Sequence, residues 1–158
     1  MTTIERTIDI AATPETIWQV LTDLDGYAAW NPFLVAASGT VAVGETLTVT
    51  FKAGKRTMTL KPTLKVVEPA RRLAWLGRLV LPRIFDGAHE FVIEPLGASR
   101  SRLVQREKFR GLLVPLFGRL LADTALGFEA MNAAVKDRAE ASQGAAATPG
   151  PSPTTQAA

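Results

Sequence analysis

The chain has 158 residues, of which 47% are hydrophobic and 21% charged, and its formal net charge is +3. This length and apolar content are enough for one domain with a single core, and the mild, scattered positive charge argues against a nucleic-acid-binding protein. The sequence has no cysteine, which excludes disulfides, zinc–thiolate sites and cysteine nucleophiles.

The first thirty residues predict one strand followed by two short helices. Apolar and polar residues alternate over residues 4–11, as in a half-buried strand. Thr13 directly before Pro14 is typical of a helix N-cap and first turn, and this helix is expected to run to Leu24. Asp25 and Gly26 interrupt it, and one more helical turn is predicted at residues 27–30.

Strands without intervening helices are predicted for the middle of the chain. Turn residues separate them into residues 33–38, 46–53, 57–67, 72–79, 85–95 and 101–110. Proline cannot donate a hydrogen bond to a neighbouring strand, so Pro62 is expected to form a bulge or an edge position within residues 57–67. Strands joined by short turns pair as antiparallel neighbours.

One long helix is predicted over residues 114–140, with Pro115 in its first turn. Its apolar stripe recurs in steps of three and four, at Phe117, Leu120, Leu121, Thr124, Phe128, Met131 and Val135. Residues 142–158 contain no charged or aromatic residue and are rich in Pro, Ala and Thr, which predicts a disordered tail after a folded domain of residues 1–141.

These elements predict an α+β fold. A curved antiparallel sheet of about seven strands is expected to wrap round the long C-terminal helix, with two short helices after the first strand. A sheet curved in this way leaves a cavity between its concave face and the helix stripe.

The sequence motifs of this chain resemble those of the SRPBCC superfamily, the START-like helix-grip proteins that include polyketide cyclase/dehydrase and lipid-transport domains. The resemblance spans about residues 3–141 and rests on ATPE (12–15), IW (17–18), YAAWNPF (27–33), VGE (43–45), VEPARRLAW (67–75), HEF (89–91) and EKFRGL (107–112). It implies the helix-grip fold and the binding or carriage of a hydrophobic small molecule, lipid-like or polycyclic. A cyclase/dehydratase-like enzyme is one alternative, and an accessory module acting at a membrane or protein surface is another. Of these, a non-catalytic ligand-binding domain is favoured.

His89 is the only histidine, and alternation places it on the inward face with Phe91. If the last hairpin is centred on Ala98, paired residue numbers sum to 196, so that His89 faces Glu107 and Phe91 faces Gln105. A histidine beside a carboxylate in an apolar cavity can act as a proton donor and acceptor, which makes His89 and Glu107 the candidate catalytic residues. The alternative is a structural polar pair that fixes the hairpin.

The residues expected to contact a ligand are mainly large apolar side chains with a few polar groups. They are Trp30, Phe33, Phe51, Met58, Trp75, His89, Phe91, Gln105, Glu107, Phe109, Phe117, Leu121, Phe128, Met131 and Asn132. Asn132 lies at the edge of the helix stripe, where its amide could orient a ligand carbonyl or hydroxyl, or could simply be capped or hydrated. One histidine is too few for a typical metal site, and neither a metal nor a cofactor is predicted.

Two apolar segments, residues 79–82 and 111–115, could form a cavity rim that meets an apolar ligand or, transiently, a membrane surface, or could pack on each other. The sequence shows neither an N-terminal secretory signal nor a stretch of the ~20 apolar residues needed to span a bilayer. A cytoplasmic protein without stable membrane insertion is therefore expected. The sequence makes no prediction of oligomeric state.

Overall fold

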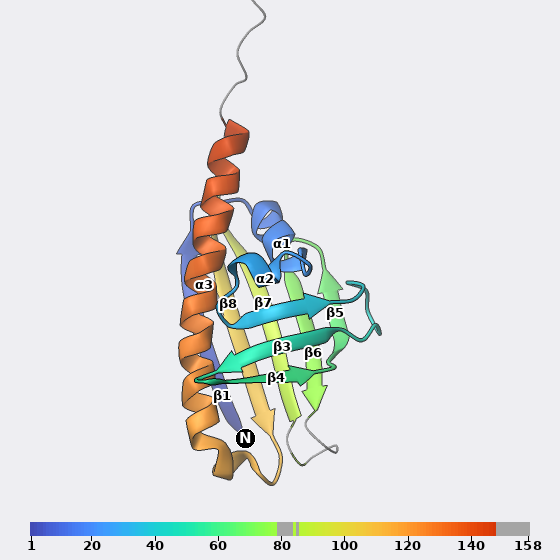
Figure 1. The fold of residues 1–158 in the computed structure, drawn as a ribbon. Helices are drawn as coiled ribbons and strands as arrows, with labels where there is room; N and C mark the ends of the chain where they lie inside the picture. The colour runs from blue at the N-terminus through green and yellow to red at the C-terminus, as the bar shows by residue number, and fades with distance from the viewer. Residues whose placement is uncertain (79–83, 85, 148–158) are drawn as a thin grey trace, which may run out of the picture.

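The computed structural model describes residues 1–78, 84 and 86–147, and it has an α+β fold in which two antiparallel sheets lie against one long helix (Figure 1). In chain order the elements are β1 (Thr2–Ile10), α1 (Pro14–Thr22), α2 (Tyr27–Trp30), β2 (Leu34–Ser38), β3 (Thr48–Ala53), β4 (Arg56–Leu60), β5 (Thr63–Glu68), β6 (Arg72–Arg78), β7 (Asp86–Gly97), β8 (Arg100–Arg110), the 3₁₀ turn η1 (Val114–Phe117) and α3 (Gly118–Ala147). The helix-grip arrangement predicted from the sequence is confirmed. Of the predicted strand ends, Leu79 and Phe85 lie outside the described residues.

The larger sheet has the strand order β1-β8-β7-β6-β5, and the smaller sheet has the order β2-β3-β4. The register predicted for the last hairpin is confirmed, because His89 pairs with Glu107 and Phe91 pairs with Gln105. The pairing shifts by one residue only next to the turn, between Pro95 and Gly97. The long alternating part of the hairpin therefore keeps its inward and outward faces.

The single strand predicted over residues 57–67 is instead two strands, so the described chain has eight strands rather than about seven. The break falls at Pro62, which has no N–H to donate to a strand partner. Its carbonyl still accepts from Leu47 N at 2.9 Å, and Leu64 N donates to Glu45 O at 2.8 Å. These bonds form a corner where the chain passes from the smaller sheet to the larger one.

Helix α3 runs along the β1–β8 side of the larger sheet and packs most closely on β1 and α1 (Figure 1). Lys136 Nζ donates to the Asp9 carbonyl at 2.9 Å and to Glu140 Oε1 at 2.7 Å. The backbone N–H of Ala11 also donates to Glu140 Oε1, at 2.8 Å. The bond from Lys136, together with the one from Ala11, lowers the pKa of the Glu140 carboxyl. The upper half of α3 is thus held to the segment that leaves β1.

The helix continues to Ala147, seven residues past the predicted helix end and into the predicted tail. Gln143 explains part of this extension, since its Oε1 accepts from Thr13 N at 3.2 Å and from Thr16 Oγ1 at 3.0 Å. Residues 142–147 are therefore helical, and residues 148–158 of the predicted tail lie outside the described residues.

A glycine in the middle of α3 makes room for an aromatic ring. A Cβ atom built on Gly127 would overlap the ring of Phe33. Phe33 is buried there and packs edge-on against Phe128, with ring centroids 5.5 Å apart. Glycine costs about 1 kcal/mol relative to alanine inside a helix, so its presence here reflects the close approach of Phe33 to the helix backbone.

We expect Gly127→Ala to lower the free energy of unfolding by about 1–2 kcal/mol, because the overlap outweighs the gain in helix propensity. Chemical denaturation would measure the change. Gly144→Ala is the matched control in the same helix, since its Cβ would meet open space, and it should leave stability unchanged or raise it. Equal effects of the two substitutions would contradict the steric role of Gly127.

Candidate functional site

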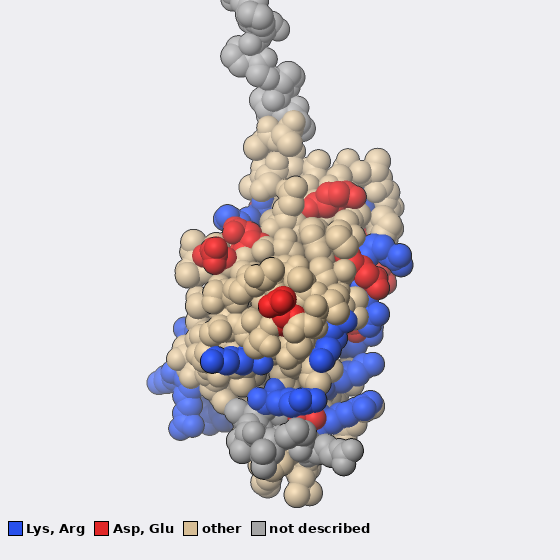
Figure 2. Space-filling model, turned by 90° about the vertical axis from the view of Figure 1, so that its right-hand side faces the viewer, with Lys and Arg blue, Asp and Glu red and all other residues tan. Residues whose placement is uncertain are grey.

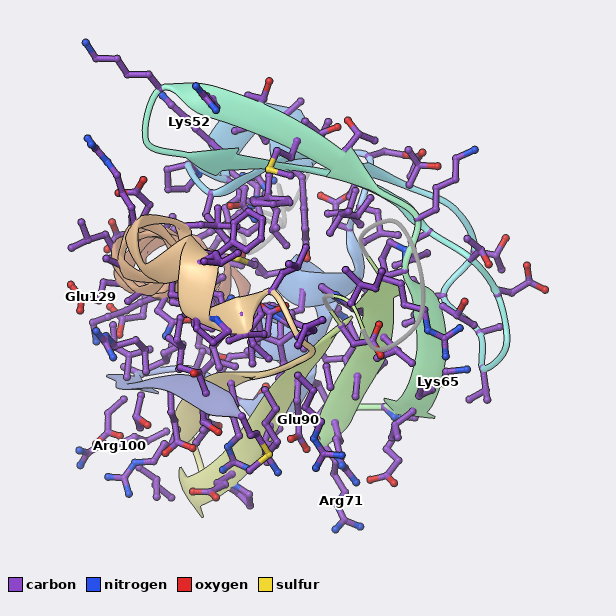
Figure 3. All side chains as sticks on the ribbon, turned by 90° about the horizontal axis from the view of Figure 1, so that it is seen from below. Lys52, Lys65, Arg71, Glu90, Arg100 and Glu129 are labelled. Atoms are coloured by element: carbon purple, nitrogen blue, oxygen red, sulfur yellow. The ribbon has the colours of Figure 1, made fainter. Side chains whose placement is uncertain are left out.

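A cavity of about 70 Å³ lies between the lower ends of the two sheets and the lower part of α3. Viewed from below, the smaller sheet and the larger sheet lie on opposite sides of this interior, with α3 along one flank (Figure 3). The cavity is lined by Phe33, Leu34, Val49, Phe51, Met58, Leu60, Pro62, Trp75, Gly77, Gly87, His89, Glu107, Phe109, Leu120 and Thr124.

Strand register explains why the cavity lies at this level of the sheet. Across β6, β7 and β8 the inward side chains form three rows, which are Leu73-Phe91-Gln105, Trp75-His89-Glu107 and Gly77-Gly87-Phe109. The first two rows carry large side chains. The third row has two neighbouring glycines, so the backbone is bare there and space remains above it.

Gly87 also decides where the Glu107 carboxylate lies. A Cβ atom on Gly87 would overlap Glu107 Oε1, so the carboxylate extends over the bare backbone of β7. A Cβ atom on Gly77 would meet only ordinary contacts, the nearest being Leu60 Cδ1 at 3.6 Å. The two glycines therefore differ, since Gly87 accommodates a charged group, whereas Gly77 borders Leu60 and Pro62 at ordinary contact distances.

His89 is 4% exposed, and its ring is contacted on one face and at both nitrogens. Its ring stacks on Trp75 with centroids 4.6 Å apart and an interplanar angle of 8°. Its Nδ1 lies 3.6 Å from Glu107 Oε2, and its Nε2 lies 3.3 Å from Gln105 Nε2. An amide nitrogen only donates, so with the Gln105 amide in this orientation His89 Nε2 accepts, and a ring with one proton carries it on Nδ1, facing Glu107.

Glu107 is the group through which a molecule in the cavity would meet a charge. Its side chain is 16% exposed, and it lines the cavity with the polar residues His89 and Thr124. Thr124 Oγ1 already donates to the Leu120 carbonyl at 2.8 Å. The wall is thus mainly apolar, with one carboxylate acceptor beside His89.

The structure brings some of the predicted ligand contacts to the cavity and places others elsewhere. Those that line it are Phe33, Phe51, Met58, Trp75, His89, Glu107 and Phe109. Those outside it are Trp30, Phe91, Gln105, Phe117, Leu121, Phe128, Met131 and Asn132. The reason is the middle of the helix stripe, where both residues are fully buried: Met131 lies against Gln105 of the first row, and Phe128 packs edge-on against His89 of the second row.

Among the residues outside the cavity, Gln105 and Asn132 are buried polar groups. Gln105 lies beside His89 and also approaches Met131 Sδ at 3.6 Å. Trp30 borders a separate open groove on the outside of α3, where Arg138 lies 5.8 Å from its ring centre.

Several lining residues were not predicted as ligand contacts, namely Leu34, Val49, Leu60, Pro62, Gly77, Gly87, Leu120 and Thr124. The positions of the two glycines could have been recognised from the sequence. Gly77 has the parity of Trp75, and Gly87 has the parity of His89, so both are inward positions without a side chain.

Of the two predicted rim segments, residues 79–82 lie outside the described residues. Residues 111–115 form part of the connection between β8 and α3, in which Val114 is buried and Leu112 is exposed. In the part of the chain that the structure describes, no helix combines the length and the apolar character needed to cross a membrane.

A family model described as polyketide cyclase / dehydrase and lipid transport matches residues 1–142. No match is found among curated protein sequences.

Solved structures with the same fold include enzymes and a START protein. The Zhui aromatase/cyclase from Streptomyces sp. R1128 is 21% identical, with a TM-score of 0.74 over 88% of this chain and 93% of that chain. A START superfamily protein from Mycobacterium smegmatis is 16% identical, with a TM-score of 0.65 over 91% and 98% of the two chains. A point mutant of norcoclaurine synthase from Thalictrum flavum in complex with a transition-state analogue is 17% identical, with a TM-score of 0.66 over 87% and 93%. At these identities the likeness concerns the fold.

The tautomer of His89 can be read directly, because a single histidine gives a single set of imidazole signals. We expect long-range ¹H–¹⁵N spectra of the neutral form to show the proton on Nδ1, since Gln105 donates to Nε2. Gln105→Leu should weaken this preference, whereas Gln143→Leu, far from the ring, should not. A dominant Nε2–H form in the unaltered protein would contradict the arrangement.

Proposed function

Because the chain belongs to the polyketide cyclase / dehydrase and lipid transport family, we propose that it binds or carries a hydrophobic small molecule, lipid-like or polycyclic, in the cavity above Gly77 and Gly87. Family and fold support a hydrophobic-ligand-binding or cyclase role. The observation that carries the proposal is an apolar cavity into which one fixed carboxylate projects. Such sites take affinity from apolar burial and orientation from a few polar groups.

The carboxylate of Glu107 restricts how a ligand enters. It accepts hydrogen bonds and repels other anions. A ligand with a hydroxyl or amine on its buried end satisfies Glu107, whereas a fatty acid would have to enter with its chain first. The proposed ligand therefore carries a hydrogen-bond donor on an otherwise apolar body.

The cavity must widen to hold such a ligand, because pockets for drug-sized molecules measure about 300–1,000 Å³ and this one measures about 70 Å³. Met58 and Leu60 are the side chains placed to move. Both are half-buried on β4, which is an edge strand of the smaller sheet, and methionine is especially adaptable in shape. Ligand binding is therefore expected to displace this wall and leave the β6-β7-β8 rows in place.

Filling the space above the glycines should block binding. We expect 2-naphthol to change the fluorescence of Trp75, which lines the cavity, and Gly77→Val to weaken that response about tenfold or more, since the added methyl groups occupy the site. The Trp75→Phe variant identifies the source of the signal. Gly97→Ala, whose Cβ would meet open space at the β7–β8 turn, is the matched control.

The binding proposal fails if native mass spectrometry finds no bound small molecule in freshly purified protein and if Trp75 also fails to respond to naphthols, sterols and fatty acids. It fails equally if Gly77→Val binds as tightly as the unaltered chain.

A second candidate function is a cyclase or dehydratase reaction in the same cavity, favoured by the pairing of Glu107 with His89. Glu107 borders the cavity and could accept a proton from a substrate carbon next to a carbonyl. His89 would act as a positioning residue, because its Nδ1 proton points to the carboxylate while Gln105 and Trp75 fix its ring.

Glu107→Gln separates the two functions. The amide keeps the shape of the side chain but is no longer a useful base, so an enzyme should keep ligand affinity within a few fold and lose about 100-fold or more in turnover of a poly-β-ketone thioester. Product formation followed by liquid chromatography would measure it. Unchanged turnover in both Glu107→Gln and His89→Ala would exclude this mechanism and leave carriage as the function.

A further inference from the structure

The turn between β8 and α3, residues 111–117, exposes two leucines at the lower tip of the molecule (Figure 1). Leu112 is 83% exposed and Leu116 is 78% exposed. Single exposed leucines are ordinary on protein surfaces, but two on one short turn form an apolar patch that water solvates poorly.

The exposure of these leucines is built into the turn. Val114 lies between them in sequence and is buried in the core. Leu113 N donates to Ile84 O at 3.2 Å, and Leu116 N donates to Leu113 O at 2.9 Å. With Val114 anchored and the backbone bonded on both sides, Leu112 and Leu116 point outward from a structured turn.

Basic residues surround this tip. Lys108 and Arg110 end β8, Arg119 begins α3, and all three are exposed. The β3–β4 hairpin adds the exposed residues Lys52, Lys55 and Arg56. This hairpin lies beside the same end of α3, because a Cβ atom on Gly54 would be 3.0 Å from Asp123 Oδ2.

Acidic residues are fewer at this end of the described chain. Asp86 lies 3.9 Å from Arg78, and Asp123 faces the hairpin tip. On the face that Figure 2 presents, lysines and arginines gather over the lower half, and most acidic residues lie over the upper half. Among the described residues, exposed basic side chains therefore outnumber acidic ones around the two leucines.

We propose that this tip docks on an anionic lipid surface, with Leu112 and Leu116 inserted at the boundary between headgroups and acyl chains. Apolar side chains flanked by lysine and arginine are the combination that binds such surfaces. Fluid lipid accepts protruding leucines without a preformed complementary pocket, whereas a folded acidic protein would need one. The basic residues of the turn and hairpin contact the headgroups.

The docked orientation also connects the bilayer with the cavity. Phe109 and Leu120 line the cavity and flank the turn in sequence on either side. If the proposed ligand binding holds, an apolar molecule can pass from the bilayer into the protein at this end with little exposure to water. Docking itself does not require a ligand, so the two proposals can fail separately.

Co-sedimentation of the full chain with vesicles tests the docking. We expect the chain to bind vesicles of phosphatidylcholine and phosphatidylglycerol in a 1:1 ratio, and to bind pure phosphatidylcholine vesicles at least about tenfold more weakly. Added salt should weaken binding to the mixed, anionic vesicles. The double variant Leu112→Asp, Leu116→Asp should reduce the partition coefficient at least about tenfold. Leu126→Asp is the matched control, since Leu126 is 63% exposed higher on α3, and it should bind like the unaltered chain.

A second set of variants tests the contribution of the basic side chains to vesicle binding. Arg110→Glu with Arg119→Glu should weaken binding to the anionic vesicles about tenfold, while Lys65→Glu, on the opposite side from Lys52 in Figure 3, should not. Thermal denaturation would check that each variant is folded.

Docking is overturned if the unaltered chain does not bind anionic vesicles, or if the double leucine variant binds them undiminished. Binding to polyglutamate beads without binding to vesicles would assign the basic residues to an acidic macromolecule and would also overturn it. The Trp75 titration with 2-naphthol should be the same in the double leucine variant, which separates this test from that of the proposed ligand function.

Discussion

The antiparallel register of β6, β7 and β8 is the constraint on which the site depends. Each inward row across these strands meets one level of the interior, so the identity of three residues decides whether that level is filled, polar or empty. A slip of one residue would turn His89 to the outer face and bring Glu90 inward. The eleven residues of β8, paired on both sides by β1 and β7, make such a slip costly.

Features that depend on local periodicity could be predicted from the sequence. Alternation along residues 85–95 and 101–110, with a hairpin centred on Ala98, predicted the pairing of His89 with Glu107, and the stripe from Phe117 to Val135 identified the long helix. The corner at Pro62 was harder, because a proline inside an alternating segment marks a break without saying that the two halves join different sheets. The extension of α3 to Ala147 depends on Gln143 meeting Thr13 and Thr16, which are far away in the sequence.

The position of the cavity could not be predicted, because it depends on side-chain volumes contributed by several elements at once. The helix stripe suggested that Phe128 and Met131 would line it, yet both are fully buried in the core. Met131 lies against Gln105 and Phe128 packs edge-on against His89, so both side chains fill the interior beside these two rows. In the third row, Gly77 and Gly87 contribute no side-chain volume, and the cavity opens there. The absence of a side chain also matters at Gly127 on helix α3, because it lets the ring of Phe33 approach the helix and close the interior above the cavity.

The same geometry supports carriage and catalysis because both need a carboxylate that does not move. Gly87 lets Glu107 lie over β7, and His89 is prevented from rotating by its stack on Trp75 and its contact with Gln105. For a carrier, this fixed acceptor orients a ligand hydroxyl. For an enzyme, it becomes a base only if a substrate carbon bearing an acidic proton comes within hydrogen-bond reach of Glu107. What distinguishes the two functions is therefore the shape that the Met58 and Leu60 wall gives to the bound molecule, and not the polar pair itself.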